Sequence, residues 1–202
     1  MKSSSITLTG YVNAVERDSH VIHELGRTFV ERIAAGAFAK ALEQAEEIEL
    51  KLNHARVLGS TADGALTLEE DAIGLKATAI VTDEEVIRLA EADRLRGWSF
   101  GFVCPAGGDD WEESETEGLE RRIVRELELN EVSILSIDPA YIATTVEERG
   151  QTPGKRKVEL RSSEADIQVE TSAHQPDARF FIRSMEIELL KIKGGRIRNG
   201  KA

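Results

Sequence analysis

A serine, a histidine and a glutamate in separate segments of the chain are the side chains that can together carry out acyl transfer. Ser99 and Gly101 fall on one face of the apolar stretch WSFGFVC (98–104), and its three aromatic residues fall on the other face. Gly101 leaves open space beside the Ser99 hydroxyl, and a serine nucleophile needs such space, an imidazole to take its proton and donors for the oxyanion. A buried serine that only fills space and hydrogen-bonds locally is the alternative interpretation.

His54 and Glu131 are the candidate partners of this serine. His54 ends the predicted strand 49–53 and precedes a loop, so its imidazole is well placed to face a cleft. Capping of the loop is the structural alternative. Glu131 begins the stretch EVSILS and shares a strand face with Ser133. A carboxylate there can orient an imidazole, as the acid of a triad does, and a surface charge at a strand end is an equal alternative.

The other histidines and the one cysteine do not indicate a metal site. His20 and His23 form an H-x-x-H pair, but no third ligand accompanies them, and zinc needs three or four placed ligands. His174 lies in a polar segment and is expected to be solvated. Cys104 is the single cysteine, which excludes an intramolecular disulfide and Cys-rich zinc or iron–sulfur sites. We therefore expect no metal site and a reducing compartment.

Composition narrows the class of protein further. The chain has 202 residues, of which 41% are hydrophobic and 31% charged, and no run of about 18 apolar residues predicts a membrane span. The N-terminal residues lack the pattern of a secretory signal. A net charge of −11 argues against non-specific binding of nucleic acid.

Hydrophobic periodicity predicts many strands and few helices. Period-two alternation and Val/Ile/Leu content predict strands at 5–13, 27–33, 49–53, 65–70, 74–82 and 98–104, and one or two more within 122–137. Spacings of three and four predict helices within 34–49 and 83–95. The acidic stretch 109–120 is interpreted as a solvated hairpin loop. These elements favour a β-rich α+β fold, a closed or nearly closed antiparallel β-barrel flanked by helices.

The C-terminal third differs from the rest in pattern and charge. Residues 147–178 are polar, carry glycine and proline and show no sustained period, which predicts a flexible linker. Residues 179–202 hold seven basic and two acidic side chains, a charge of +5 against −16 for the preceding 178 residues. We expect a domain at 1–146, a linker at 147–178 and a basic tail at 179–202.

Five blocks, in this order, resemble the prohead (capsid maturation) serine proteases of tailed bacteriophages and prophages, a family distantly similar in fold to the herpesvirus assemblins. The blocks are ERIAAGAF (31–38), LNHARVLGST (52–61), GLKATAIV (74–81), RGWSFGFVC (96–104) and ELNEVSILSIDPAY (128–141). The resemblance covers roughly residues 5–145. It implies that His54 is the catalytic histidine and Ser99 the nucleophile, and that Glu131 matches an acidic position with an orienting role. The family often has an acidic residue after the Asn-His pair, whereas this chain has Ala55.

The resemblance implies a serine endopeptidase that needs no cofactor and acts in the host cytoplasm, inside the assembling prohead. Its substrates would be the phage scaffold and major capsid protein, and often the enzyme itself. A homo-oligomer is possible, and we expect neither nucleic acid nor a membrane as a partner. We also expect the basic tail to dock onto scaffold or shell, and the enzyme to cut itself within the linker; packing of the tail on its own acidic body is the alternative. A catalytically silent capsid-assembly or scaffold-associated protein, and an unrelated small β-barrel binding domain, are the rival interpretations.

Overall fold

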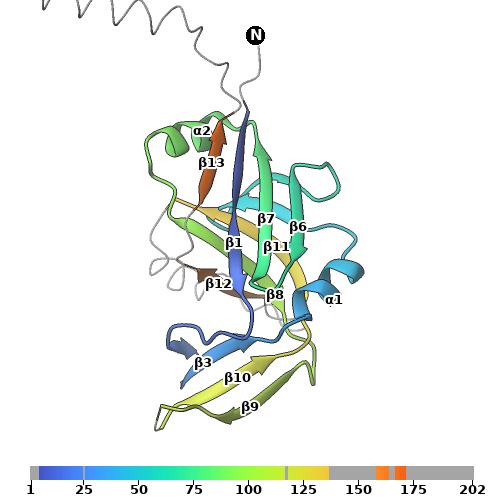
Figure 1. Cartoon of the computed structure of the whole chain (residues 1–202), viewed down its shortest axis with the longest axis vertical. Helices are drawn as coiled ribbons and strands as arrows, with labels where there is room; N and C mark the ends of the chain where they lie inside the picture. Colours follow the sequence, from blue (N-terminus) through green and yellow to red (C-terminus); the bar gives the residue numbers. More distant parts are fainter. Residues whose placement is uncertain (1–4, 25, 117, 137–157, 164–166, 172–202) are drawn as a thin grey trace, which may run out of the picture. The chain divides into compact units, whose positions relative to one another are not determined.

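The computed structural model describes residues 5–24, 26–116, 118–136, 158–163 and 167–171 (Figure 1). The chain divides into two compact units, residues 1–170 and 171–202, and the features below belong to the first unit, with Thr171 as the end of its last strand. His174 and the predicted tail at 179–202 lie outside the described residues. The division at 146 and 178 therefore stays a prediction.

The strands of the described residues form three sheets. The first has four strands, and β1, β7 and β6 follow one another side by side in Figure 1. In spatial order its strands are β13 (Gln168–Thr171), β1 (Ile6–Ala14), β7 (Gly74–Val81) and β6 (Leu66–Glu70). β7 pairs antiparallel with both β1 and β6. Ile6, Leu8 and Val12 are buried, as expected for a strand with one face toward a core.

The second sheet contains the acidic segment. In spatial order its strands are β2 (Ile22–Glu24), β3 (Arg27–Ile33), β10 (Glu120–Val124) and β9 (Asp109–Glu113). The prediction that residues 109–120 form only a loop is wrong for the first part of this segment, which forms β9. Arginines explain the difference: Arg121 stands directly opposite Glu112 and pairs with it at 2.8 Å, and Arg125 pairs with Asp110 at 2.6 Å.

The third sheet has five strands and contains all three candidate catalytic segments. In spatial order its strands are β12 (Glu159–Ser163), β8 (Gly97–Val103), β11 (Glu128–Leu135), β4 (Glu49–Leu52) and β5 (Arg56–Ser60). Every residue of β8 is buried, so this strand is covered on both faces. β12 pairs with β8 from within the segment predicted as a linker.

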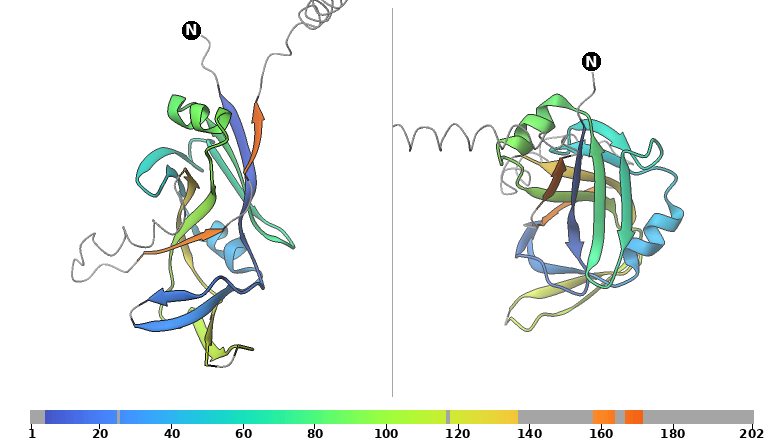
Figure 2. Two further views of the ribbon diagram at one scale, coloured as in Figure 1. Left: turned by 90° about the vertical axis from the view of Figure 1, so that its left-hand side faces the viewer. Right: turned by 45° about the horizontal axis from the view of Figure 1, so that its top comes forward.

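The prediction of a closed or nearly closed antiparallel barrel is wrong. The described strands form three open sheets, whose neighbours can be followed from two further directions in Figure 2. β10 also pairs parallel with β3, and β11 pairs parallel with β4, which an antiparallel barrel does not allow. Alternation along a strand tells which face is buried but not which distant strand lies beside it, so the pattern did not exclude three sheets.

The described part of the chain also contains two short helices. α1 (Ala37–Gln44) begins after Gly36, whose φ of 84° suits glycine, and Glu70 of β6 accepts the backbone N–H groups of Gly36 and Ala39 at 2.6 Å each. α2 (Glu84–Glu91) is capped by Asp83, which accepts two backbone N–H groups at 3.0 Å. Both are shorter than predicted.

The three sheets share one hydrophobic core with both helices. Phe38 of α1 stacks edge-on against Phe100 of β8 at 5.3 Å between ring centroids, and Leu8, Trp98 and Val132 are fully buried in the same cluster. Neither helix in the described part of the chain has the length and apolar content that crossing a membrane requires.

Candidate active site

One face of the third sheet packs into the core, and the opposite face carries a group of polar residues around Ser99. Leu50, Phe100 and Val132 point into the core. Register brings two of the polar residues directly together, since Ser133 of β11 stands opposite Ser99 of β8. Directly opposed residues on one sheet face have Cβ atoms about 5 Å apart. The strand pairing therefore builds a compact polar surface around Ser99.

The loop after β4 brings His54 to this polar face. Asn53 and His54 both have positive φ angles, 52° and 58°, which are unfavourable for residues other than glycine. Asn53 compensates by fixing the loop: its Nδ2 donates to Ser136 Oγ at 2.9 Å, and its Oδ1 accepts the Ser136 backbone N–H at 2.9 Å. The strained turn is thus held to the end of β11 by a reciprocal pair of hydrogen bonds.

His54 is in direct contact with Glu131. Its Nδ1 makes a short hydrogen bond to Glu131 Oε1, and its backbone N–H donates to Ser133 Oγ at 3.2 Å. Because an ionised carboxylate only accepts, Nδ1 carries the proton and Nε2 is left with its lone pair in the neutral ring. Nε2 is buried and has no hydrogen-bond partner. The ring is therefore oriented with a free basic nitrogen, as general-base catalysis requires.

Lys51 of β4 holds the other oxygen of Glu131. Its Nζ lies 2.9 Å from Glu131 Oε2 and 2.8 Å from Glu49 Oε2. Burial acts to raise the pKa of the Glu131 carboxyl, but the hydrogen bond from His54 and the charge of Lys51 outweigh burial and lower that pKa. Burial likewise opposes the charge on Lys51, and its two carboxylate partners nevertheless raise the pKa of its ammonium group. Glu131 is thus kept ionised beside the imidazole.

Ser99 lies on the same face but its hydroxyl has another partner. The hydroxyl donates to the backbone carbonyl oxygen of Arg161 in β12 at 2.5 Å, and the residue is 1% exposed. The expectation of open space beside Gly101 is wrong. A Cβ added there would lie 2.8 Å from Glu131 Cγ and 2.9 Å from Leu160 Cδ2, so these two side chains fill the space. The site is closed in this structure.

The structure therefore brings the three candidates onto one face, with His54 and Glu131 in contact and Ser99 bonded to β12 instead of to His54. Lys51 and Arg161 were not singled out from the sequence. Period-two alternation places Lys51 on the face opposite Leu50 and so gave a signal, but nothing in the sequence shows that Arg161 reaches Ser99.

The remaining histidines that the structure describes lie elsewhere. His23 is in β2, where its Nδ1 pairs with Thr28 Oγ1 at 3.0 Å, and His20 is exposed just before that strand. Within the described ranges no group of three or more metal-ligating side chains comes together.

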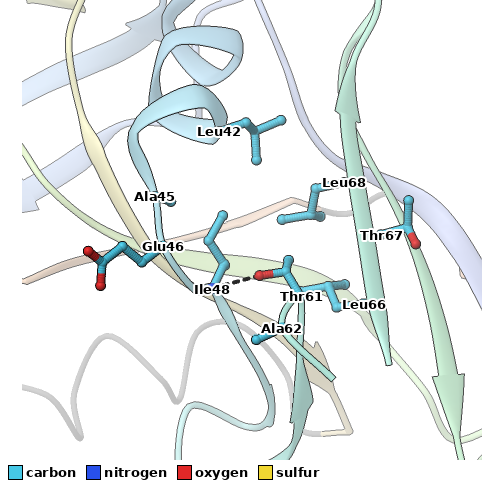
Figure 3. Close-up of a pocket in the computed structure, with 9 residues that line it drawn as sticks. All are labelled: Leu42, Ala45, Glu46, Ile48, Thr61, Ala62, Leu66, Thr67 and Leu68. Carbon is cyan, nitrogen blue, oxygen red and sulfur yellow. Dashed lines mark hydrogen bonds between the residues drawn. The ribbon is translucent and has the colours of Figure 1, made fainter. Parts of the chain in front are cut away.

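A pocket of about 410 Å³ lies between the end of α1 and β6 (Figure 3). Its lining includes Leu42, Ile48 and Leu68, with Glu46 as its single carboxylate. The Thr61 hydroxyl is already engaged, since it accepts the Ile48 backbone N–H at 3.0 Å. The pocket has no nucleophile paired with a base, so we assign no chemistry to it.

Comparison with known proteins gives one match. A family model described as caudovirus prohead serine protease matches residues 1–157. No curated protein and no solved structure matches the chain.

Proposed function

Because the chain belongs to the caudovirus prohead serine protease family, we propose that it is a serine endopeptidase that cleaves scaffold and capsid proteins, and itself, during prohead maturation. Family membership, which rests on residues 1–157, supports the reaction class and the setting inside the prohead. One observation carries the assignment of residues: Glu131 occupies Nδ1 of His54, and the buried Nε2 is left without a partner on the sheet face that bears Ser99.

The proposed reaction is acyl transfer through a covalent intermediate. Ser99 Oγ attacks the scissile carbonyl carbon, and His54 Nε2 takes the hydroxyl proton as the C–O bond forms. The C–N bond then breaks, and the imidazolium gives the proton to the leaving amine. Water hydrolyses the acyl-enzyme by the same route and restores the Ser99 hydroxyl. Glu131 keeps Nδ1 protonated and stabilises the imidazolium, while Lys51 keeps Glu131 ionised.

A fluorophosphonate probe followed by peptide mass spectrometry tests this proposal. We expect the adduct on Ser99 in the wild-type chain and no adduct in Ser99→Ala. Ser60→Ala is the matched control, because Ser60 is another buried serine in the same sheet and lies in β5. It should label like the wild type.

Because β12 covers Ser99, the rate of labelling should depend on how firmly β12 is bound. Ser99 is 1% exposed, so labelling should be slow in the wild type and faster in Arg161→Ala, which loosens the strand that covers the hydroxyl. If none of the folded variants is labelled, the chain is instead a catalytically silent capsid-assembly or scaffold-associated protein.

A further inference from the structure

We propose that the edge of β8 beside Ser99 binds substrate peptides as an added β-strand, that β12 occupies this site as an internal competitor, and that the site selects arginine. The proposal rests on the proposed function and names the class of substrate that the same site would take. It concerns peptides in extended conformation, with an arginine at the residue whose carbonyl meets Ser99.

Strand order leaves one edge of β8 for a peptide. β11 occupies one side of β8 and β12 the other, where β12 is the last strand of the sheet (Figure 1). β12 pairs antiparallel with β8, with Leu160 opposite Gly101 and Ser162 opposite Ser99. If β12 leaves, β8 presents a row of unpaired N–H and C=O groups, which is the surface that peptides bind by strand addition.

β12 presents its backbone to the nucleophile as a substrate would. The Ser99 hydroxyl donates to the Arg161 carbonyl oxygen, and a carbonyl carbon lies about 1.2 Å from its oxygen. The Arg161 carbonyl is thus the carbonyl of β12 that is in contact with the hydroxyl. The hydroxyl is bonded to this oxygen and not to His54 Nε2, so β12 blocks attack by Ser99 in the observed arrangement. A substrate residue in the place of Arg161 would supply the carbonyl that is attacked.

The Arg161 side chain occupies a built site on the second sheet. Its guanidinium donates to both oxygens of Glu31, from Nε at 2.7 Å and from Nη2 at 3.0 Å. The second carboxylate outside β12 that it contacts is Glu24, at 3.4 Å, and the centroid of the Phe102 ring lies 5.7 Å from the guanidinium carbon. The Glu31 side chain is only 2% exposed. A two-pronged contact with a buried carboxylate fits a guanidinium and not an ammonium group.

The charge of this site requires a cation once β12 is displaced. β12 contributes Glu159 and Arg161, and both leave with it. Of the carboxylates that the structure pairs with Arg122, Glu31 and Asp109 would remain, two negative charges beside one guanidinium. Glu31 would keep Arg122 at 3.0 Å but lose both hydrogen bonds from Arg161. A buried carboxylate that loses charged hydrogen bonds is destabilised, so the empty site favours a ligand that brings a guanidinium.

Fluorescence anisotropy with a labelled peptide tests the site directly. The peptide has the sequence of residues 158–163, VELRSS, and a second peptide carries leucine in place of its arginine. The proteins are full-length chains that all carry Ser99→Ala, so no cleavage can occur. The host with Arg161→Ala has a weakened β12 and should bind the arginine peptide about tenfold more tightly than the parent host, because loss of charged hydrogen bonds frees more of the site. Arg125→Ala, an exposed arginine paired with Asp110, should bind like the parent.

The outcomes decide between the alternatives. In the Arg161→Ala host the leucine peptide should bind about tenfold more weakly than the arginine peptide, since charged hydrogen bonds are lost. Equal binding of the two peptides, or no binding to this host, would overturn the proposal. Leu160→Ala, which weakens β12 without touching the ion pairs, is measured in parallel in case Arg161→Ala does not fold. Binding needs no catalysis, so peptide binding without fluorophosphonate labelling of Ser99 would retain the peptide site and reject the protease.

Discussion

Replacing Glu131 by glutamine should separate the orienting role of this residue from its contribution to stability. The substitution keeps the shape of the side chain that fills the space beside Gly101 but removes its charge. An amide can donate to His54 Nδ1 and so favour the wrong tautomer, with the proton on Nε2. A comparable change in a serine protease triad lowers kcat by about 10⁴, so we expect a loss of about 10²- to 10⁴-fold, or about 2.7–5.5 kcal/mol. Weak activity should remain.

The same substitution should reduce stability by less than it reduces transition-state stabilisation. Lys51 keeps its contact with Glu49 at 2.8 Å, so its ammonium group does not become an unpaired buried charge. We expect a loss of about 1.5–3 kcal/mol in the free energy of unfolding, the scale of one hydrogen bond to a charged group.

The assay compares kcat/KM on a peptide substrate with urea unfolding, for Glu131→Gln and for a matched control. The control is Glu128→Gln, an exposed glutamate on the same strand, which should retain wild-type activity. Near-full activity in folded Glu131→Gln would refute the orienting role, and Asp138, which follows this strand in the sequence, would be the next acid to test.

Three further predictions concern the role of Ser99 as nucleophile, the stability of the protein at acidic pH and self-cleavage within the linker. Ser99→Ala should abolish proteolysis and change the free energy of unfolding by about 1 kcal/mol or less, as measured by urea unfolding, because it removes one oxygen and one hydrogen bond. The pKa of Glu131 is lowered on folding, so its stabilising contribution is complete above the pKa of an unfolded glutamate, about 4.3, and is lost as pH falls through the lower folded value. The stability gap between wild type and Glu131→Gln should therefore narrow only below about pH 4.3 in pH-dependent unfolding. Mass spectrometry of aged protein should find a C-terminal fragment lost within residues 147–178 from the wild type alone; equal trimming of Ser99→Ala would reject self-cleavage.

The sequence predicted most of the strands because their alternation is local. β1, β4, β6, β7 and β8 lie within a residue or so of their predicted ranges. β2 and β5 are short and lack a clear period, and β12 lies in a polar segment, so all three were missed. The pairing of distant strands has no local signal, which is why a single barrel was predicted where three sheets form.

The sequence indicates which residues form the candidate site, but not that β12 covers Ser99. Alternation placed Ser99 on the polar face of its strand, and the resemblance supplied the roles proposed for His54 and Glu131. The Arg161 carbonyl on the Ser99 hydroxyl comes from the pairing of β12 with β8, between residues 62 positions apart. Such a contact depends on tertiary packing, so the closure of the site had no signature in the sequence.

The contacts that hold β12 on β8 indicate how a high concentration of substrate would expose Ser99. Arg161 is bound by charged groups, and a substrate arginine would take over the same partners, so exchange of one strand for the other leaves Glu31 paired throughout. The two strands therefore differ little in contacts, and their effective concentrations decide which one is bound. A tethered strand acts at a fixed effective concentration, in the millimolar range for short flexible tethers, so only densely packed substrate chains would displace it. Under the proposed function, substrate chains packed inside an assembling shell would meet that condition, whereas at low concentration β12 would keep Ser99 covered.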